Sequence, residues 1–218
     1  MVENIDDNLK RLFVKIKELG IVENTIVIFM TDNGPQQQRY LAGLRGLKGN
    51  GFQGGIRAPF FIRYPARFKG NKEISALTAH MDVLPTLAEL CSFEVPTDRE
   101  IDGKSMLPLI RGDKTESQDR SYFTYWTRRY PELYENISIQ KAGWKLVGNT
   151  GYNAAIENFE LFDLSKDRYE LQNLSKTNPA KAKELKSELD EIYQELIHEE
   201  NLVNPPVIQI GNNAENPV

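Results

Sequence analysis

An Asp-Asn-Gly turn sequence directly follows a short apolar run and is the first place in the chain where side chains could do chemistry. The run Thr25–Met30 is continuous and rich in β-branched residues, which is typical of a strand buried on both faces of a parallel sheet. Asp32 and Asn33 follow its carboxyl end, where open α/β sheets bind their ligands. The same residue types also favour a plain turn, so a ligand site and a turn both remain open.

The next segment, residues 41–58, is rich in glycine and carries three cations. Six glycines within thirteen residues indicate positive φ angles or a close approach of the backbone to another group. Arg45, Lys48 and Arg57 lie in this segment, and cations together with exposed backbone N–H groups suit an oxyanion. The order of residues is that of neither a P-loop nor a dinucleotide fingerprint. An anion site and a flexible surface loop are the two interpretations.

Composition excludes several other chemistries. Cys91 is the only cysteine, so an intrachain disulfide and a cysteine-clustered zinc site are excluded, and we expect Cys91 to be a small buried core residue. His80 and His198 are far apart in the sequence, which argues against a histidine-rich metal centre. A net charge of −4 gives no electrostatic case for a nucleic-acid or anionic-membrane partner. No apolar run is long enough to span a bilayer.

The elements that must position these residues alternate between helix and strand in the first half of the chain. Apolar residues at helical spacing predict an amphipathic helix over residues 3–19 that covers a sheet. Residues 25–30 and 59–64 are predicted strands, and residues 82–91 a short helix with Asp82 at its N-cap. Helix, short loop and buried strand together indicate an α/β domain.

A wholly polar stretch, residues 111–120, is interpreted as a connection between two subdomains. After it, four short runs predict a small antiparallel sheet, with Gly143 as a hairpin turn between the second and third: residues 122–126, 137–140, 144–147 and 160–163. Asn178 and Pro179 begin a long helix that reaches about His198. Residues 201–218 are rich in Asn and Pro and are expected to be loosely held.

Six segments resemble motifs of the sulfatases, within the larger alkaline-phosphatase-like group, and they occur in the family's order from about residue 3 to residue 198. Each motif alone is weak, and the six in order make the resemblance specific. They are Asn24–Phe29 with Asp32-Asn33-Gly34, Lys48–Pro59 (a Lys-Gly-x-x-x-Glu-Gly-Gly-x-Arg-x-Pro-like segment), His80–Leu87, Asp102–Ser105 with Leu107, Gly143–Leu146, and Glu160–Leu164 with Asp167, Glu170, Asn173 and Leu174.

The resemblance implies an α/β fold: the C-terminal portion of a sulfatase α/β sheet domain, followed by a small antiparallel-sheet subdomain with a packed C-terminal helix. The expected ranges are residues 1–110 for the first part, 111–200 for the second and 201–218 for a loosely held tail.

The family's chemistry implies roles for particular residues. Sulfatases hold one calcium ion, and the resemblance makes Asp32 and Asn33 two of its ligands here. It makes Lys48 a catalytic and sulfate-binding cation, and Arg57 a weaker substrate-binding candidate for which a structural ion pair is the alternative. Calcium takes six to eight oxygen ligands, so this chain is expected to hold only part of the site and to bind calcium weakly or not at all by itself.

The family's nucleophile is a formylglycine made from Cys or Ser in a Cys/Ser-x-Pro-Ser/Ala-x-Arg segment. Cys91 is followed by Ser92-Phe93-Glu94-Val95-Pro96, which does not match. We therefore expect the C-terminal segment of an arylsulfatase-like sulfuric ester hydrolase, inactive without an N-terminal half. Two residues depart from the family pattern: Arg168 replaces a usual Pro, and Gln53 replaces a usual Glu, which bears on the hydrogen bonding around Lys48.

Two alternatives remain: a non-catalytic or degenerate binding module, and a phosphoester hydrolase of the same superfold. Asn33 favours the calcium sulfatase, because two-metal phosphatases of the group place a histidine there for zinc.

The expected partners are a sulfate ester, the N-terminal sulfatase half, and a second copy of the chain, because half a sheet exposes an edge and an apolar face. A sulfated glycan would contact Tyr125, Trp126, Arg128, Arg129 and Tyr130, which could instead form a strand edge packed on the larger domain. Sulfatases are mostly periplasmic, secreted or lysosomal, and the resemblance implies a periplasmic or secreted location. The acidic start, residues 1–7, lacks the pattern of a signal peptide.

Overall fold

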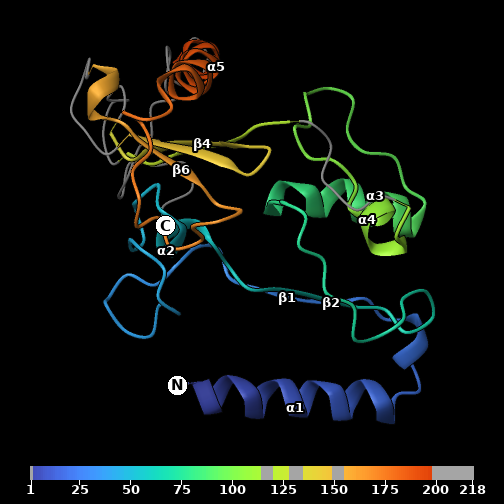
Figure 1. Ribbon diagram of the computed structural model, residues 1–218. Coiled ribbons are helices and arrows are strands. Elements are labelled where there is room, and N and C mark those ends of the chain that lie inside the picture. Colours follow the sequence, from blue (N-terminus) through green and yellow to red (C-terminus); the bar gives the residue numbers. More distant parts are fainter. Residues whose placement is uncertain (1, 114–119, 128–134, 149–154, 198–218) are drawn as a thin grey trace, which may run out of the picture. The chain divides into compact units, whose positions relative to one another are not determined.

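The computed structural model describes residues 2–113, 120–127, 135–148 and 155–197 (Figure 1). The chain divides into two compact units, residues 1–33 with 57–120, and residues 34–56 with 121–218. Helices, antiparallel sheets and a C-terminal helix together give the mixed α/β class that the sequence predicted. The domain ranges predicted from the sequence stay a prediction. No helix in the described ranges is long and apolar enough to cross a membrane.

The first unit begins with the predicted amphipathic helix, α1 (Val2–Glu18), which ends before Gly20 at a φ of 69°. A 3-10 turn, Val22–Asn24, leads into β1 (Val27–Met30). This strand pairs with β2 (Phe60–Arg63), and the two lie side by side in Figure 1. Both predicted strands are therefore present.

Two details predicted for β1 are wrong. Its partner β2 runs antiparallel, with Val27 opposite Arg63 and Met30 opposite Phe60. All four residues of β1 are half-buried rather than buried on both faces. An apolar run indicates that a strand is covered, but the direction of its partner depends on the connection between the two strands. Among the described residues β1 has β2 as its one hydrogen-bonded strand neighbour.

The predicted helix near residue 82 is present as a 3-10 turn, His80–Asp82, followed by α3 (Val83–Cys91). A short helix α4 (Leu107–Arg111) follows in the same unit. Asp82 occupies the N-cap position of α3 as predicted, but its side chain makes no cap hydrogen bond there. Its buried carboxylate instead accepts the N–H groups of Ala79 and Lys104, each at 2.9 Å, and pairs with the Arg120 guanidinium.

Thr86 continues this connection one helical turn later. Its hydroxyl donates to the Asp82 carbonyl oxygen at 2.6 Å and accepts the Met106 N–H at 2.8 Å. The two sulfatase-like segments around residues 82 and 103 are thus joined by buried polar contacts, which gives both motifs a structural role within the first unit.

The prediction that Cys91 is buried is wrong, because the residue is exposed. The buried side of the helical segment runs through Asp82, Thr86 and Leu90, which are spaced four residues apart. Cys91 is the last residue of α3, one position beyond that line, and Ser92 ends the helix with a φ of 57°. The apolar pattern alone predicted a buried face that includes Cys91. The polar contacts of Asp82 and Thr86 instead bury the face that ends at Leu90.

Gly103 has no room for a side chain. A Cβ at this position would lie 2.0 Å from the Met81 carbonyl oxygen. We expect Gly103→Ala to lower the free energy of unfolding by about 1–3 kcal/mol, because neither backbone segment can move without losing the Asp82 contacts. Gly70→Ala is the matched control, since a Cβ at Gly70 meets no atom within 4 Å. Urea unfolding measures both, and equal midpoints for the two variants would contradict this packing.

The second unit contains a four-stranded antiparallel sheet in the order β3-β4-β5-β6, as predicted. Ala142 and Gly143 connect the second and third strands, and both have positive φ, at 46° and 81°. This is the backbone that a two-residue hairpin turn requires. The strands are β3 (Tyr122–Tyr125), β4 (Ile137–Lys141), β5 (Trp144–Gly148) and β6 (Glu160–Asp163), with a 3-10 turn, Ile156–Asn158, before the last.

The C-terminal helix α5 (Pro179–Ile197) begins after Asn178, as predicted, and packs on this sheet (Figure 1). Its buried stripe, the facing strands and Phe159 just before β6 form one apolar core: Ala182, Leu185, Leu189 and Tyr193 with Ile137, Ile139, Leu146, Phe159 and Leu161. The second unit also includes the glycine-rich residues 34–56, which contain the short helix α2 (Gln53–Ile56). His198 and the predicted tail, residues 201–218, lie outside the described residues.

Candidate functional site

Asp32 and Asn33 follow β1 in the first unit and form a local turn. The Asp32 carboxylate accepts the Asn33 N–H at 3.0 Å, and the Thr31 hydroxyl donates to the Asn33 carbonyl oxygen at 3.3 Å. Asp32 is exposed and Asn33 is half-buried. The turn that the sequence allowed is therefore present, and it places one carboxylate and one amide side chain at the end of a strand.

The donor chemistry at this turn is that of a hard cation. Carboxylate and amide oxygens suit calcium, and two such residues provide fewer than the six to eight ligands that the ion takes. In the part of the chain that the structure describes, no group of three or more His, Cys, Asp or Glu side chains could hold a metal ion. The residues present fit part of a calcium site.

Lys48 lies in the glycine-rich part of the second unit, where the backbone folds tightly on itself. The Lys48 N–H donates to the Pro35 carbonyl oxygen at 3.0 Å, and the Gly34 N–H donates to that of Gly55 at 2.9 Å. A Cβ at Gly55 would lie 2.3 Å from the Leu47 carbonyl oxygen. Close approach of backbone to backbone thus explains Gly54 and Gly55, whereas Gly46 and Gly49 have positive φ, at 89° and 87°.

The three cations of this segment differ in what they contact. Arg45 donates two hydrogen bonds to the Glu160 carboxylate, at 2.7 and 2.8 Å, and its guanidinium lies 4.0 Å from the centre of the Phe52 ring. The Arg45 side chain therefore has a structural role within the second unit. Lys48 is exposed, and its ammonium makes no ion pair or hydrogen bond with the residues the structure describes.

Arg57 belongs to the first unit and is exposed. Among the described residues it has no ion-pair partner, so the structural ion pair that the sequence allowed is absent from this part of the chain. Asp32 and Asn33 are in the first unit, and Lys48 is in the second.

Gln53, which replaces the usual Glu of the family motif, is buried and has its hydrogen-bond partners. Its side-chain amide donates to Gln140 at 3.2 Å, and its backbone N–H donates to the Glu170 carboxylate at 2.7 Å. The other oxygen of Glu170 accepts the Lys145 ammonium at 2.6 Å. Lys145 and Glu170 are each 0% exposed.

Burial lowers the pKa of the Lys145 ammonium to about 8, although the charge and hydrogen bond of Glu170 oppose this shift. The sequence did not predict that Lys145 and Glu170 form a buried ion pair. Lys145 and Glu170 belong to two of the sulfatase-like segments, but their separation of 25 residues gives no sign that they meet at the backbone of Gln53.

An aromatic side chain lies beside the lysine segment. A Cβ at Gly49, the residue after Lys48, would lie 3.6 Å from the Trp126 indole, and Trp126 is 39% exposed. Tyr125 packs edge-on against Tyr193 of α5, with 5.5 Å between the ring centres, so it belongs to the core. The other three residues of the predicted sugar-binding surface, Arg128, Arg129 and Tyr130, lie outside the described residues.

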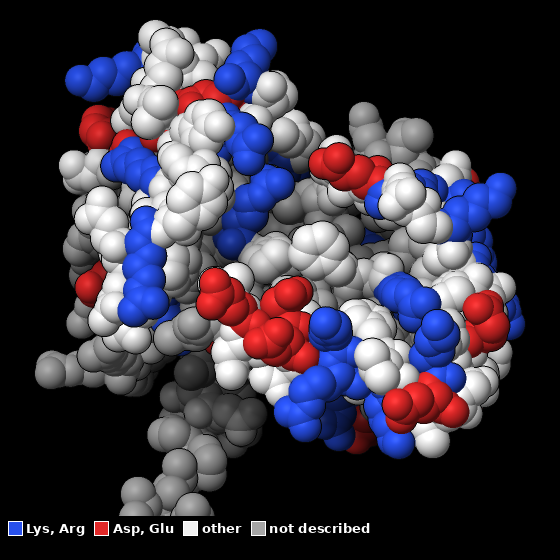
Figure 2. Space-filling view, turned by 90° about the horizontal axis from the view of Figure 1, so that it is seen from below, with Lys and Arg blue, Asp and Glu red and all other residues white. Residues whose placement is uncertain are grey.

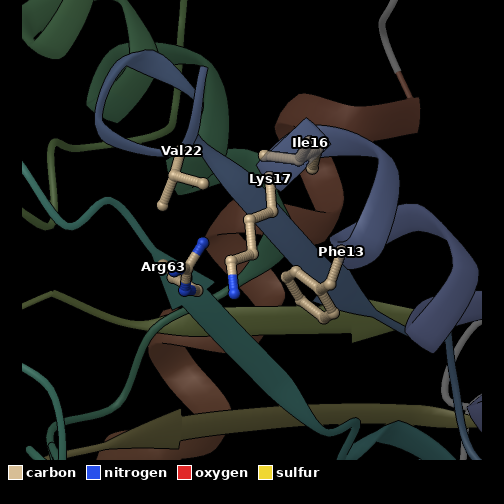
Figure 3. Close-up of a pocket in the computed structure, with 5 residues that line it drawn as sticks. All are labelled: Phe13, Ile16, Lys17, Val22 and Arg63. Carbon is tan, nitrogen blue, oxygen red and sulfur yellow. The ribbon is translucent and has the colours of Figure 1, made fainter. Parts of the chain in front are cut away.

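The first unit has a shallow groove between α1 and β2, of about 570 Å³. Figure 3 shows the side chains that line it: Phe13, Ile16, Lys17, Val22 and Arg63. None of the predicted site residues borders this groove. Much of the surrounding apolar surface is exposed, including Leu12, Val14 and, at 65% exposure, Phe61. The self-association predicted from the sequence stays a prediction.

Two known protein families match this chain. Residues 49–199 match the family described as N-sulphoglucosamine sulphohydrolase, C-terminal. Residues 1–92 match the family described as sulfatase. The chain belongs to the sulfatase family. The two matches together place it in the C-terminal region of these enzymes, as the motifs implied.

Similar sulfatases come from mammals and bacteria. Mouse steryl-sulfatase is 36% identical over 134 residues, which is 57% of this chain and 22% of the mouse protein. An N-acetylgalactosamine-6-O-sulfatase of Bacteroides thetaiotaomicron is 28% identical over 217 residues, which is 88% of this chain and 41% of that protein. The chain thus spans between about a fifth and two-fifths of the length of these two relatives.

Several solved structures share the fold. The crystal structure of Ps i-CgsB with a neocarrahexaose superposes with a TM-score of 0.76 at 24% identity, covering 88% of this chain and 41% of the other. A protein bound to its substrate D-glucosamine-2-N,6-O-disulfate gives a TM-score of 0.66 at 25% identity, with 89% and 39% covered. A phosphonate monoester hydrolase of Agrobacterium radiobacter gives 0.65 at 21% identity, covering 89% and 40%, which shows the shared fold alone.

Proposed function

We propose that this chain supplies part of the active site of an arylsulfatase-like sulfuric ester hydrolase. In this proposal Asp32 and Asn33 are ligands of one calcium ion, and Lys48 is the catalytic cation that contacts the sulfate group. The observation that carries the proposal is the contrast between the two cations of the glycine-rich segment. Arg45 is held by Glu160 and Phe52, whereas the Lys48 ammonium is exposed on a backbone that is fixed by hydrogen bonds.

The chemistry explains why a lysine is useful at this position. Sulfate ester hydrolysis moves negative charge onto the leaving oxygen and the sulfuryl oxygens, and a positioned cation stabilises that charge. Lys48 provides a compact positive charge with three donors. Bound calcium would add a second, harder positive charge at the oxygens of Asp32 and Asn33. Arg57 is proposed as a further, weaker contact to the substrate anion.

We propose that the nucleophile comes from an N-terminal sulfatase segment and that the 218 residues alone are inactive. The proposal includes a periplasmic or secreted location, as in most of the family. Figure 2 shows both acidic and basic side chains on one face of the molecule, and the net charge of −4 is the reason that the proposal includes no nucleic-acid or anionic-membrane partner.

We expect the chain alone to bind calcium with a dissociation constant no tighter than about 1 mM, because it offers few of the oxygen ligands that a tight site needs. Isothermal titration calorimetry of the chain with calcium chloride measures this. Micromolar binding that disappears in Asp32→Ala would contradict the prediction of a partial site. Asp98→Ala is the control for loss of an exposed carboxylate, because Asp98 pairs only with its neighbour Arg99 among the described residues.

We propose a sulfated sugar as the substrate class. The similar Bacteroides protein is an N-acetylgalactosamine-6-O-sulfatase, and one similar structure contains D-glucosamine-2-N,6-O-disulfate as its substrate. In this chain, Trp126 lies against Gly49, next to the proposed sulfate-binding lysine. An indole beside the sulfate position offers an apolar face for the sugar ring.

Trp126→Ala is expected to raise KM for a sulfated monosaccharide by about tenfold, with little change in kcat, because ring stacking stabilises ground and transition states alike. Steady-state kinetics of the assembled enzyme, meaning this chain together with an N-terminal sulfatase segment, measures both constants. Tyr40→Ala is the matched control, since Tyr40 is a 91% exposed aromatic residue of the same unit. An unchanged KM in Trp126→Ala would contradict the proposal that the sugar ring contacts Trp126.

The function itself is tested by the substrate preference of the assembled enzyme. We expect p-nitrophenyl sulfate to be hydrolysed faster than p-nitrophenyl phosphate or a phenylphosphonate monoester, because Asn33 stands where a zinc-binding phosphatase would place histidine. Faster phosphonate turnover would support the phosphoester hydrolase. No turnover of any ester by the folded assembly would support a non-catalytic binding module.

A further inference from the structure

The fully buried carboxylate of Glu170 joins two parts of the second unit. One oxygen accepts the Lys145 ammonium of β5 at 2.6 Å, and the other accepts the Gln53 backbone N–H at 2.7 Å. An ion pair needs only the first of these contacts. The second reaches the glycine-rich segment, five residues after Lys48, so this pair fixes more than the sheet.

The backbone around Lys48 and Gln53, residues 45–54, is held at several points. The Gly54 N–H donates to the Arg45 carbonyl oxygen at 2.6 Å, and the Asn50 N–H donates to that of Leu47 at 2.9 Å. A Cβ at Gly51 would lie 3.0 Å from the Ile137 carbonyl oxygen of β4, so the segment lies directly on the sheet. A shift at Gln53 would therefore be transmitted through a short, tightly packed chain to Lys48.

Glu170 also occupies an unfavourable backbone conformation. Its φ is 58°, in the left-handed region that residues with a Cβ rarely adopt. The Arg45 guanidinium donates to the Glu170 carbonyl oxygen at 3.4 Å, so the same residue contacts the glycine-rich segment a second time. A strained backbone conformation persists only where surrounding contacts fix it, and such residues are often found at functional sites.

We propose that Glu170 is a positioning residue, which holds the Gln53 backbone and thereby fixes Lys48 where the sulfate group binds. It does this without contacting the substrate. The inference rests on the proposed function for the role of Lys48, and the structural part of it concerns the second unit alone.

Two double variants separate positioning from stability. Lys145→Met/Glu170→Leu replaces the ion pair by apolar side chains and removes the acceptor for the Gln53 N–H. Lys145→Met/Glu170→Gln keeps an amide oxygen as that acceptor, but buries an amide N–H pair without a partner. The leucine variant is therefore expected to be the more stable of the two, and the glutamine variant the better at holding Gln53.

Amide hydrogen exchange of the 218-residue chain reads out the position of Gln53 without any activity. We expect the Gln53 amide to exchange about tenfold faster or more in the leucine variant, and within about threefold of wild type in the glutamine variant. Leu189→Ala is the control, since it destabilises the core of the same unit without touching the segment. Exchange at Gln53 that follows overall stability across all three variants would overturn the inference.

Kinetics of the assembled enzyme on p-nitrophenyl sulfate completes the test. The leucine variant is expected to lose about tenfold in kcat/KM, the glutamine variant is expected to recover most of it, and the loss should disappear when Lys48 is already alanine. A loss that is unchanged in the Lys48→Ala background would overturn the inference. If the wild-type assembly does not hydrolyse the ester, the proposed function fails, and the exchange experiment still decides whether Glu170 holds Gln53.

Discussion

Glu170→Leu alone should lower the free energy of unfolding by about 3–5 kcal/mol, which is among the largest effects expected for any single substitution in this chain. The reason is that Lys145 is 0% exposed and would lose its partner, so a charged or newly deprotonated amine would be left in the core. The Gln53 N–H would lose its acceptor at the same time. Urea unfolding followed by circular dichroism measures the loss.

The double variant Lys145→Met/Glu170→Leu is the control for this prediction. Replacing both members of a buried ion pair by apolar residues of similar volume is often neutral or stabilising. We therefore expect the double variant to recover most of the stability that the single variant loses. A single variant as stable as the double one would show that the pair carries no buried charge that needs compensation.

Lys48→Ala should reduce kcat of the assembled enzyme on p-nitrophenyl sulfate by about 10²–10³-fold, the usual effect of removing one group that stabilises developing negative charge. Folding should be unaffected, because the Lys48 ammonium is exposed and has no partner among the described residues. Lys48→Arg should recover only part of the rate, because a planar guanidinium does not replace a compact ammonium.

Lys176→Ala is the matched control, since Lys176 is an exposed lysine of the same unit that has no partner among the described residues. Its kcat should equal that of wild type. A Lys48→Ala variant that keeps the wild-type kcat would remove Lys48 from the catalytic machinery, whatever its effect on KM.

The sequence predicted the elements of this chain well where local chemistry decides them. Alternating short runs and a Gly143 turn identified all four strands of the small sheet, and Asn178 with Pro179 marked the start of α5. Pairing direction is not local, which is why the parallel environment predicted for residues 25–30 was wrong.

The candidate site shows the same limit. Asp32, Asn33 and Lys48 could be named because their motifs are contiguous in the sequence. The contact of Glu170 with Lys145 and the Gln53 backbone joins residues separated by 25 and 117 positions, and no residue type or spacing encodes that meeting. Arg45 shows the opposite error. Its residue type suited an anion-binding site, but its guanidinium pairs with the carboxylate of Glu160, far along the chain.

Cys91 was placed wrongly for a related reason. Helical periodicity identifies an apolar face, but the face that is buried also depends on polar side chains such as Asp82, whose partners Lys104 and Arg120 come from later in the sequence. The spacing of apolar residues in the helix carries no information about those contacts.

We propose that this chain brings Asp32, Asn33 and Lys48 to a sulfatase active site, and a complementation assay tests this proposal most directly. An N-terminal sulfatase segment with its formylglycine nucleophile is mixed with the 218-residue chain in calcium-containing buffer, and sulfate release from p-nitrophenyl sulfate is followed. We predict no release from either part alone, release from the mixture, and loss of that release when the chain carries Asp32→Ala or Lys48→Ala. Release that is equal with wild-type and substituted chains, or a folded, calcium-loaded mixture that releases none, would contradict the claim.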